Sequence, residues 1–375
     1  MKPVNKIIID KRENYGVRKI DMKPKSVLII NEGYSDNLGD QAINDSLQYL
    51  LKVNDIQNAK FQDYTKNLNG PLRIPCGKNE EIKKQTLLNK AIRLLPVKIR
   101  WLILNFPRVL IASKSQYDLI IIGGGQLVLS NATFAIAMFT WVSCLKIFGN
   151  KNVVICGVGL GSEFTFIDRI LFKYSLNSAR DIYLRDDRSQ EVLFAQFGMK
   201  SKFIYDVAFV HNKILYNIKE KEQNKALLGV TSYAVYRKYA EGDKLSKDEF
   251  YDTWVTLLSK SSVPLNEVEL FYTTKEDRSA SIEFQEYIKR IYNVSLKLIE
   301  TNNLELLISE VNSSQLVISA RMHALILAFT YHRNIICYPI SEKLFEFNRM
   351  IEGTHTLVEI QSVIEKNFSS LLKGK

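Results

Sequence analysis

Short apolar runs alternate with amphipathic segments along most of the chain. The runs are rich in β-branched residues and bounded by turn residues, which is typical of buried strands. The clearest amphipathic segment begins at Asp40 and carries Ile43, Leu47, Leu50 and Leu51 on one face, as a helix packed on a sheet does. A regular alternation of strands and helices predicts parallel sheets built from βαβ units.

The predicted strands form two sets, one in each half of the chain. The first set is Val27–Asn31, Leu119–Ile122, Val153–Cys156, Ile182–Leu184 and Phe203–Tyr205. The second set is Leu227–Val230, Val268–Phe271, Leu296–Ile299, Leu316–Ile318 and Ile335–Cys337. The polar stretch Asn217–Lys225 separates them and is the best linker candidate. Because 375 residues are many for one core, we predict two doubly wound, Rossmann-like α/β domains in tandem, over residues 1–216 and 226–375.

The last segment, Leu357–Leu372, is predicted to be a helix that could pack back on the N-terminal domain. The first residues of the chain lack the apolar region and cleavage site of a signal peptide, so we expect a cytoplasmic protein. The long uncharged stretch between Asp118 and Lys146 contains Gly123-Gly124-Gly125, which divides it into a short strand, a turn and a helix. We interpret this stretch as protein core and not as a membrane span.

The chain carries 51 basic and 40 acidic residues, and part of this excess is local. No acid occurs between Glu81 and Asp118, whereas basic residues from Lys83 to Lys114 are interleaved with apolar and aromatic ones such as Trp101. This basic amphipathic segment, residues 83–114, fits either an anionic membrane surface or a solvated basic helix. Nucleic acid is not expected as a partner, because no known binding motif is present. The four cysteines are scattered, with no CxxC pair, so we expect no metal site.

Unusual residues follow the predicted strands repeatedly, at the positions where open parallel sheets bind ligands. They are Asn37, Gly39 and Asp40 after the first strand, Gly123, Gly124 and Gly125 after the second, Gly157 and Gly159 after the third, Arg185 after the fourth, and Ser319, Arg321 and His323 in the second half. Each has an alternative structural interpretation. Asp40 fits the N-cap of a helix or a partner for a sugar hydroxyl, and a glycine triplet fits a tight turn as well as a close approach of the backbone to another group. Gly157–Gly161 lacks the later glycine and the acidic residue of a dinucleotide loop, so no nicotinamide cofactor is expected.

Three side chains carry the strongest chemical signal. Arg185 ends an apolar strand, where its planar guanidinium can pair with a carboxylate or phosphate, although a surface ion pair is the alternative. Arg321 and His323 interrupt the very apolar stretch Leu316–Tyr331, where a charge without a partner is costly. A histidine beside an arginine at a strand-to-helix turn therefore predicts an active site.

Taken together, these segments resemble the polysaccharide pyruvyltransferase family over most of the chain. The matching residues are Asn37-Leu38-Gly39-Asp40-Gln41-Ala42, Gly123-Gly124-Gly125, Gly157-Val158-Gly159, Arg185-Asp186 with Ser189, Asp206-Val207-Ala208-Phe209, and Ser319-Ala320-Arg321-Met322-His323. The chain departs from the family after Gly161, where Ser162-Glu163-Phe164 stands at a place that often holds a proline.

The resemblance implies a GT-B-like fold with its active site in the cleft between the two domains. It also implies transfer of a pyruvyl group from phosphoenolpyruvate to a sugar of a surface polysaccharide or cell-wall precursor, giving a cyclic ketal and phosphate. By similarity, Arg185, Arg321 and His323 stand at positions associated with donor binding. Our hypothesis is that Arg185 and Arg321 hold the donor while His323 acts as general acid or base. The binding residues implied are Asn37, Gly39, Asp40, Gly123, Gly124, Gly125, Gly157, Gly159, Ser319 and Lys343. No cofactor beyond the donor substrate is expected.

The acceptor in this family is a saccharide made as a lipid- or nucleotide-linked precursor, and the basic segment 83–114 would suit a lipid-linked one at the inner face of the plasma membrane. Two rival functions share the predicted architecture. One is a GT-B glycosyltransferase that uses a nucleotide sugar. The other is a sugar- or anion-binding homologue without turnover.

Overall fold

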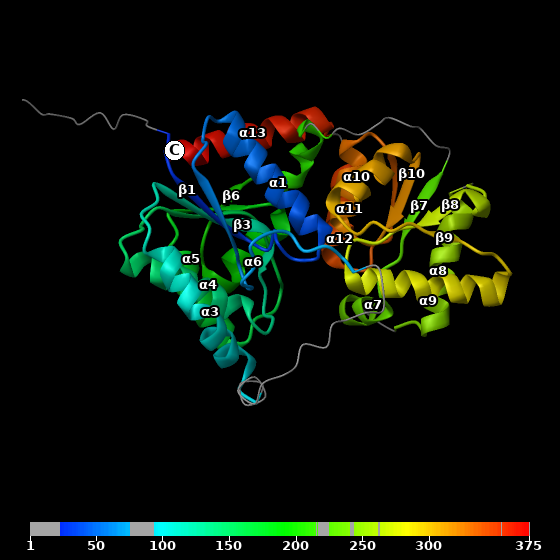
Figure 1. Cartoon of the computed structure of the whole chain (residues 1–375), viewed down its shortest axis with the longest axis horizontal. Helices are drawn as coiled ribbons and strands as arrows, with labels where there is room; N and C mark the ends of the chain where they lie inside the picture. The colour runs from blue at the N-terminus through cyan, green and yellow to red at the C-terminus, as the bar shows by residue number, and fades with distance from the viewer. Residues whose placement is uncertain are drawn as a thin grey trace, which may run out of the picture.

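The computed structural model describes residues 23–75, 94–214, 216, 225–240, 244–261, 263–353 and 355–374. It contains two parallel sheets that lie side by side, each flanked by helices (Figure 1). The N-terminal sheet has the strand order β2-β1-β3-β4-β5-β6, and the C-terminal sheet has the order β11-β10-β7-β8-β9. The prediction of two doubly wound α/β domains is confirmed.

The strands of the first sheet are β1 (Val27–Asn31), β2 (Ala59–Asp63), β3 (Leu119–Val128), β4 (Val153–Leu160), β5 (Asp181–Leu184) and β6 (Lys202–Phe203). Those of the second are β7 (Ala226–Gly229), β8 (Val268–Leu270), β9 (Lys297–Leu298), β10 (Leu316–Ser319) and β11 (Asn334–Cys337). Every predicted strand is present. The pattern missed β2, because this edge strand has only two apolar residues and is mostly only partly buried.

Gly123-Gly124-Gly125 was predicted to form a turn after a strand and Gly157–Gly161 to follow one, and both placements are wrong. Strand β3 continues through Gly123, Gly124 and Gly125, and β4 continues through Gly157 and Gly159. The pairing of β3 with β4 shifts register after Gly125, which accommodates the left-handed backbone of Gly124 and Gly125. A Cβ on Gly123 would lie 1.9 Å from the carbonyl oxygen of Cys156, so the two strands approach too closely for any other residue.

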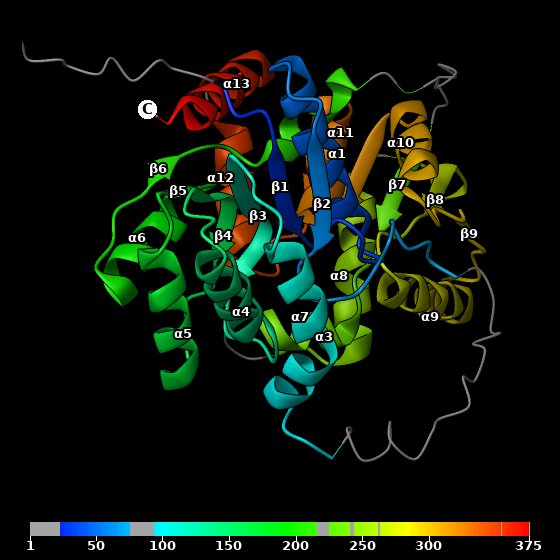
Figure 2. The same cartoon turned by 60° about the vertical axis from the view of Figure 1, so that its left-hand side comes forward.

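The N-terminal sheet is covered by α1 (Leu38–Val53), α3 (Val97–Ser113), α4 (Phe134–Ile147), α5 (Phe166–Asn177) and α6 (Asp187–Phe197), and a 3₁₀ segment, η1 (Val207–Lys213), follows β6. Figure 2 shows α3, α4 and α5 side by side on one face of this sheet. The C-terminal domain contains α7 (Tyr233–Tyr239), α8 (Lys247–Lys260), η2 (Leu265–Glu267), α9 (Lys275–Tyr292), α10 (Leu304–Ser313), α11 (Met322–Thr330) and α12 (Glu342–Glu352).

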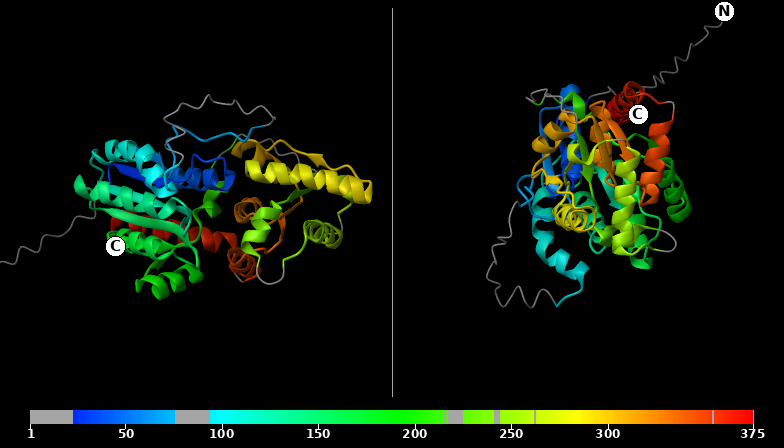
Figure 3. Two further views of the ribbon diagram at one scale, coloured as in Figure 1. Left: turned by 90° about the horizontal axis from the view of Figure 1, so that it is seen from below. Right: turned by 90° about the vertical axis from the view of Figure 1, so that its right-hand side faces the viewer.

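The last helix, α13 (Leu357–Lys373), returns to the N-terminal domain and lies along it beside α1 (Figure 1). Gln361 Nε2 donates to the carbonyl oxygen of Phe209 at 2.8 Å, and Arg180 Nη2 donates to that of Leu371 at 2.7 Å. One apolar cluster runs through both domains by way of η1, α11 and α13. The junction between the two domains is therefore part of one apolar core, which both lobes in Figure 3 share. The expected linker at Asn217–Lys225 lies almost entirely outside the described residues.

Within the described part of the chain, no helix combines the length and apolar character that crossing a bilayer requires.

Candidate active site in the interdomain cleft

A cleft of about 480 Å³ separates the two domains at the carboxyl ends of both sheets. The N-terminal domain contributes Glu32, Asn37, Gly39, Asp40, Gln126 and Arg185 to its walls. The C-terminal domain contributes Lys238, Tyr239, Glu276, Arg321, His323 and Lys343. Because the carboxyl ends of parallel strands are where helix N-termini and their unpaired N–H groups gather, this is the expected ligand site of both domains at once.

Helix α1 begins at this cleft, two residues earlier than predicted. Asn37, and not Asp40, is its N-cap: the Asn37 side chain accepts a hydrogen bond from the Gly39 N–H at 3.1 Å and donates to Asp40 Oδ2 at 2.8 Å. The Leu38 N–H donates to the carbonyl oxygen of Thr273 in the other domain at 3.0 Å. The first turn of α1 is thereby fixed to both walls of the cleft.

Asp206 joins the arginine of one domain to the histidine of the other. Its Oδ2 lies 2.9 Å from Arg185 Nη1 and 3.3 Å from His323 Nε2. Burial alone would raise the pKa of Asp206, but the neighbouring His323 and Arg185 outweigh it and hold that pKa well below its usual range. Asp206 is therefore a carboxylate at neutral pH, and it can accept a hydrogen bond from Nε2 of His323.

Two glycines make room for these side chains. A Cβ on Gly39 would lie 2.5 Å from His323 Nδ1, and a Cβ on Gly159 would lie 2.8 Å from Arg185 Nε. Both contacts are shorter than atoms tolerate, so the positions of His323 and Arg185 require glycine there. Gly159 also lines a neighbouring cavity, described below.

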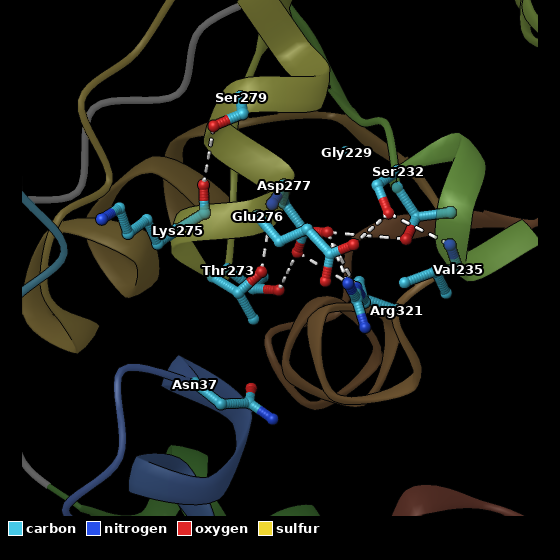
Figure 4. A network of polar contacts seen from close by, with 12 residues as sticks. Asn37, Gly229, Ser232, Val235, Thr273, Lys275, Glu276, Asp277, Ser279 and Arg321 are labelled. Carbon is cyan, nitrogen blue, oxygen red and sulfur yellow. Dashed lines mark hydrogen bonds and ion pairs between the residues drawn. The ribbon is translucent and has the colours of Figure 1, made fainter. Parts of the chain in front are cut away.

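Arg321 is held by a buried carboxylate, Asp277 near the start of α9. Its Nε lies 3.0 Å from Oδ2 and its Nη2 lies 2.6 Å from Oδ1 of Asp277, which also accepts from Thr273 Oγ1 at 2.9 Å. Burial would lower the pKa of Arg321, but the Asp277 carboxylate outweighs it and raises that pKa. Figure 4 shows this network, with Asn37 of α1 facing it. The guanidinium is thus fixed in direction while about a quarter of the side chain (26%) stays exposed.

Lys343 adds a third cation to the cleft. Its side chain is exposed to the open cleft, yet surrounding protein partly desolvates the ammonium group. Desolvation, together with the charges of Arg185 and Arg321, lowers the pKa of Lys343 to about 8. Burial raises the pKa of Asp40, against the charges of His323, Lys343 and Arg185. Three cations, one imidazole and two carboxylates at the cleft therefore lie close enough to interact electrostatically. They are Arg185, Arg321, Lys343, His323, Asp40 and Asp206.

The other predicted binding residues have different positions. Ser319 is fully buried below the cleft, where its Oγ accepts from the Arg321 N–H at 3.1 Å and donates to the carbonyl oxygen of Gly229. It therefore positions Arg321 and does not line the cavity. Gly123, Gly124, Gly125 and Gly157 lie within the strands and do not line the cleft either. Gly123 packs closely against the neighbouring strand and Gly124 and Gly125 against α1, whereas Gly157 has a left-handed backbone and faces Val207 of η1.

The sequence-based prediction gave no site role to several acids, of which Glu32 is the most unusual. Glu32 lines the cleft, and burial together with the nearby Asp63 raises its pKa to about 8. Its Oε1 is buried and has no hydrogen-bond partner in the described part of the protein. The available signal was its place directly after the buried strand β1. Asp277 gave no comparable signal, because its partner Arg321 lies far away in the sequence. Asp206 belongs to the matching segment Asp206-Val207-Ala208-Phe209, but no role in the site was predicted for it.

Within the described residues, no group of three or more histidine, cysteine or acidic side chains converges as metal ligands do. The same cleft instead contains two arginines that are each paired with a carboxylate, a lysine, and a histidine whose imidazole is held by Asp206. This set can bind a small polyanion and exchange a proton with it.

A family model described as polysaccharide pyruvyl transferase matches residues 37–342 of the chain, a range that includes Arg185, Arg321 and His323. No curated protein matches the chain.

Solved structures resemble this one in fold. One is a putative UDP-N-acetylglucosamine 2-epimerase from Listeria monocytogenes, with 13% identity over 92% of this chain and 88% of that chain and a TM-score of 0.51. Another is a UDP-GlcNAc 2-epimerase from Methanocaldococcus jannaschii in complex with UDP-GlcNAc and UDP, with 10% identity over 92% and 99% of the two chains and a TM-score of 0.50. At such identities the likeness concerns the fold alone, and it confirms the predicted GT-B-like arrangement.

Proposed function

Given that the chain belongs to the polysaccharide pyruvyl transferase family, we propose that it transfers a pyruvyl group from phosphoenolpyruvate to two hydroxyls of a sugar. The observation that supports this most is the convergence of Arg185, Arg321 and Lys343 around His323 in a single cleft. Phosphoenolpyruvate carries a carboxylate and a phosphate on one carbon. A site for it needs several cations close together with a proton donor beside them.

The donor is held by fixed cations. Arg185 and Arg321 are each braced by a buried carboxylate, so their guanidinium groups lose little freedom when a ligand binds. Pairing with Asp206 and Asp277 also reduces their net charge. Lys343 therefore supplies the charge that balances the donor, and its pKa of about 8 keeps the ammonium form predominant at neutral pH.

The reaction needs one proton at carbon and loses two from the sugar. In our proposal His323 gives a proton to C3 of the enol, which becomes the methyl group, while one sugar oxygen bonds to C2. The C2–O bond to phosphate then breaks as the second sugar oxygen bonds to C2. One of the two hydroxyl protons returns to His323, and the other leaves with inorganic phosphate. Asp206 faces Nε2 of His323, so we assign proton exchange to Nδ1, which lies beside Gly39.

We place the acceptor in a second cavity, of about 390 Å³, that adjoins the cleft. Arg185 and Lys343 line both spaces, and Gln126, Ser130 and Tyr239 add hydroxyl, amide and aromatic surface suited to a sugar. A lipid- or nucleotide-linked saccharide of a surface polysaccharide or cell-wall precursor is the proposed acceptor class. The proposed location is the cytoplasm, with peripheral contact at the inner face of the plasma membrane.

The test is incubation with phosphoenolpyruvate and a panel of lipid-linked and nucleotide-linked oligosaccharides. Release of phosphate together with a pyruvyl mass increment on one acceptor supports the proposal. Release of nucleotide from a sugar nucleotide instead would support a glycosyltransferase. Ligand binding without any product would support a non-catalytic homologue.

A matched pair of variants assigns the histidine. His323→Ala should abolish turnover, whereas His332→Asn, at an exposed turn where the left-handed backbone suits asparagine, should leave it unchanged. Full turnover by His323→Ala would exclude the assigned role.

A further inference from the structure

Helices α3 and α5 expose an unusual number of large apolar side chains. Phe166 is 78% exposed and Ile111 is 67% exposed, and further large apolar side chains on the same two helices are also exposed. The full set, here called the α3–α5 face, is Val97, Ile99, Ile103, Leu104, Phe106 and Ile111 on α3, and Phe166, Ile167, Ile170 and Tyr174 on α5. Both helices pack against α4, and Figure 2 shows the three side by side. The apolar side chains therefore belong to one face of the N-terminal domain.

Within helices α3 and α5, the exposed charge has one sign. Helix α3 contains no acid, and the only acid of α5, Asp168, is buried and paired with Lys98. The basic residues of the two helices and their ends are Lys98, Arg100, Arg108, Lys114, Arg169 and Lys173. Of these, Arg169 and Lys173 are exposed beside the apolar residues of α5. Apolar side chains among cations complement an anionic lipid surface, which offers both acyl chains and negative headgroups.

The face is joined directly to the proposed acceptor cavity. Lys98 near the start of α3 lies 2.5 Å from Asp168 Oδ1 on the first turn of α5, and Ser130 Oγ donates to Asp168 Oδ2. Ser130 itself lines the acceptor cavity. One buried carboxylate therefore ties together the two helix starts and the wall of the cavity. A surface bound at the starts of α3 and α5 is therefore linked through Asp168 to the wall of the acceptor cavity.

From these observations we propose that the α3–α5 face docks on an anionic membrane surface and presents the acceptor cavity to a saccharide carried on a membrane lipid. This deepens the proposed function and rests on it for the identity of the acceptor. Aliphatic and aromatic side chains enter the interface between headgroups and acyl chains, while Arg169 and Lys173 contact the headgroups. Docking sets the distance and direction from the bilayer to Arg185 and His323.

The test is co-sedimentation with vesicles of phosphatidylcholine alone and with added phosphatidylglycerol, at low and raised salt. The unmodified chain should bind the anionic vesicles, bind the neutral ones weakly, and be released as salt rises. The variant Ile103→Ser/Phe166→Ser/Ile170→Ser should bind at least about tenfold more weakly. Arg169→Ala/Lys173→Ala should lose about fivefold for each charge removed, and on anionic vesicles only.

The control variant is Ile291→Ser/Phe345→Ser/Val358→Ser, which removes exposed apolar residues from helices α9, α12 and α13 instead. It should bind as the unmodified chain does. A thermal shift by phosphoenolpyruvate, equal in all variants, shows that the donor cleft is intact. The vesicle assay uses no donor, so a chain that binds vesicles but not phosphoenolpyruvate refutes the proposed function and leaves the docking surface standing.

The proposal is overturned if the protein does not bind anionic vesicles at low salt, or if the α3–α5 variant binds as well as the control. It is also overturned if light scattering without lipid shows an oligomer that the α3–α5 variant converts to a monomer. In that case the face is an interface between copies of the chain.

Discussion

Replacing Asp206 with asparagine tests the link between the two domains of the site. The substitution keeps the shape of the side chain but removes the charge that lies 2.9 Å from Arg185 and 3.3 Å from His323. A hydrogen bond to a charged group contributes about 1.5–3 kcal/mol, and a buried charge left without its partner costs about 3–5 kcal/mol. Because asparagine still accepts one hydrogen bond, we expect a loss of about 3 kcal/mol in the free energy of unfolding.

The effect on turnover should be larger than the effect on donor binding. Without the carboxylate, the imidazole of His323 loses the partner that orients its Nε2. General acid–base catalysis is worth about 10²- to 10⁴-fold, so kcat should fall at least about 100-fold. KM for phosphoenolpyruvate should rise more modestly, because Arg185 keeps its place between Gly159 and the cleft.

The stability difference should also depend on pH. The folded-state pKa of Asp206 is depressed, so its contribution is fully present above its unfolded value, about 3.9, and is lost as pH falls toward the depressed pKa. The variant and the unmodified chain should therefore differ most at neutral pH and converge in acid. Denaturant unfolding at several pH values measures this difference.

The control is Asp55→Asn, which removes a carboxylate from an exposed ion pair with Lys23 at a left-handed position that asparagine tolerates. Its stability should change by less than about 1 kcal/mol and its kcat not at all. Asp206→Glu, which keeps the charge, should recover part of the kcat. If Asp206→Asn retained kcat within about threefold of the control, the assigned role of the Asp206–His323 pair would be wrong.

Three further outcomes follow from the cleft. Gly39→Ala should lower kcat by about tenfold or more with a smaller change in stability, because the added methyl group meets His323 Nδ1; steady-state kinetics and thermal melting measure the two effects. KM for phosphoenolpyruvate should rise as pH increases through about 8, where Lys343 loses its proton, and Lys343→Arg should remove that rise. Glu32→Gln should be as stable as the unmodified chain near pH 5 and more stable at pH 9. The folded-state pKa of Glu32 is raised, so the stability of the unmodified chain falls as pH rises from the unfolded value, about 4.3, to about 8. Urea unfolding at both pH values measures this difference.

The sequence predicted the strands well because each is a compact apolar run between polar segments. It missed β2, whose five residues AKFQD lie at the sheet edge and are mostly only partly buried. It also placed the ends of β3 and β4 too early, because glycine usually marks a turn. Here the glycines permit strands and α1 to approach within distances that a Cβ would block, so the strands continue through them.

The site was predictable where a charged residue stood out against an apolar background. Arg321 and His323 interrupt a buried stretch, and Arg185 ends a buried strand. Of their carboxylate partners, Asp277 stands in polar surroundings, whereas Asp206 interrupts the apolar run Phe203–Val210, a signal of the same kind to which no site role was given. Only the fold brings Asp206 next to a histidine 117 residues away. The raised pKa of Glu32 likewise arises from burial and from Asp63 on another strand, which no local pattern reveals.

The most direct test of the central claim follows the oxygen that joins carbon and phosphorus in phosphoenolpyruvate. The donor is labelled with heavy oxygen at this bridging position and incubated with the protein and an accepting saccharide. If the chain transfers pyruvyl groups, C–O cleavage leaves the label in inorganic phosphate, and each phosphate is matched by one pyruvyl group on the acceptor. Unlabelled phosphate, or labelled phosphate without a pyruvylated acceptor, would contradict the account.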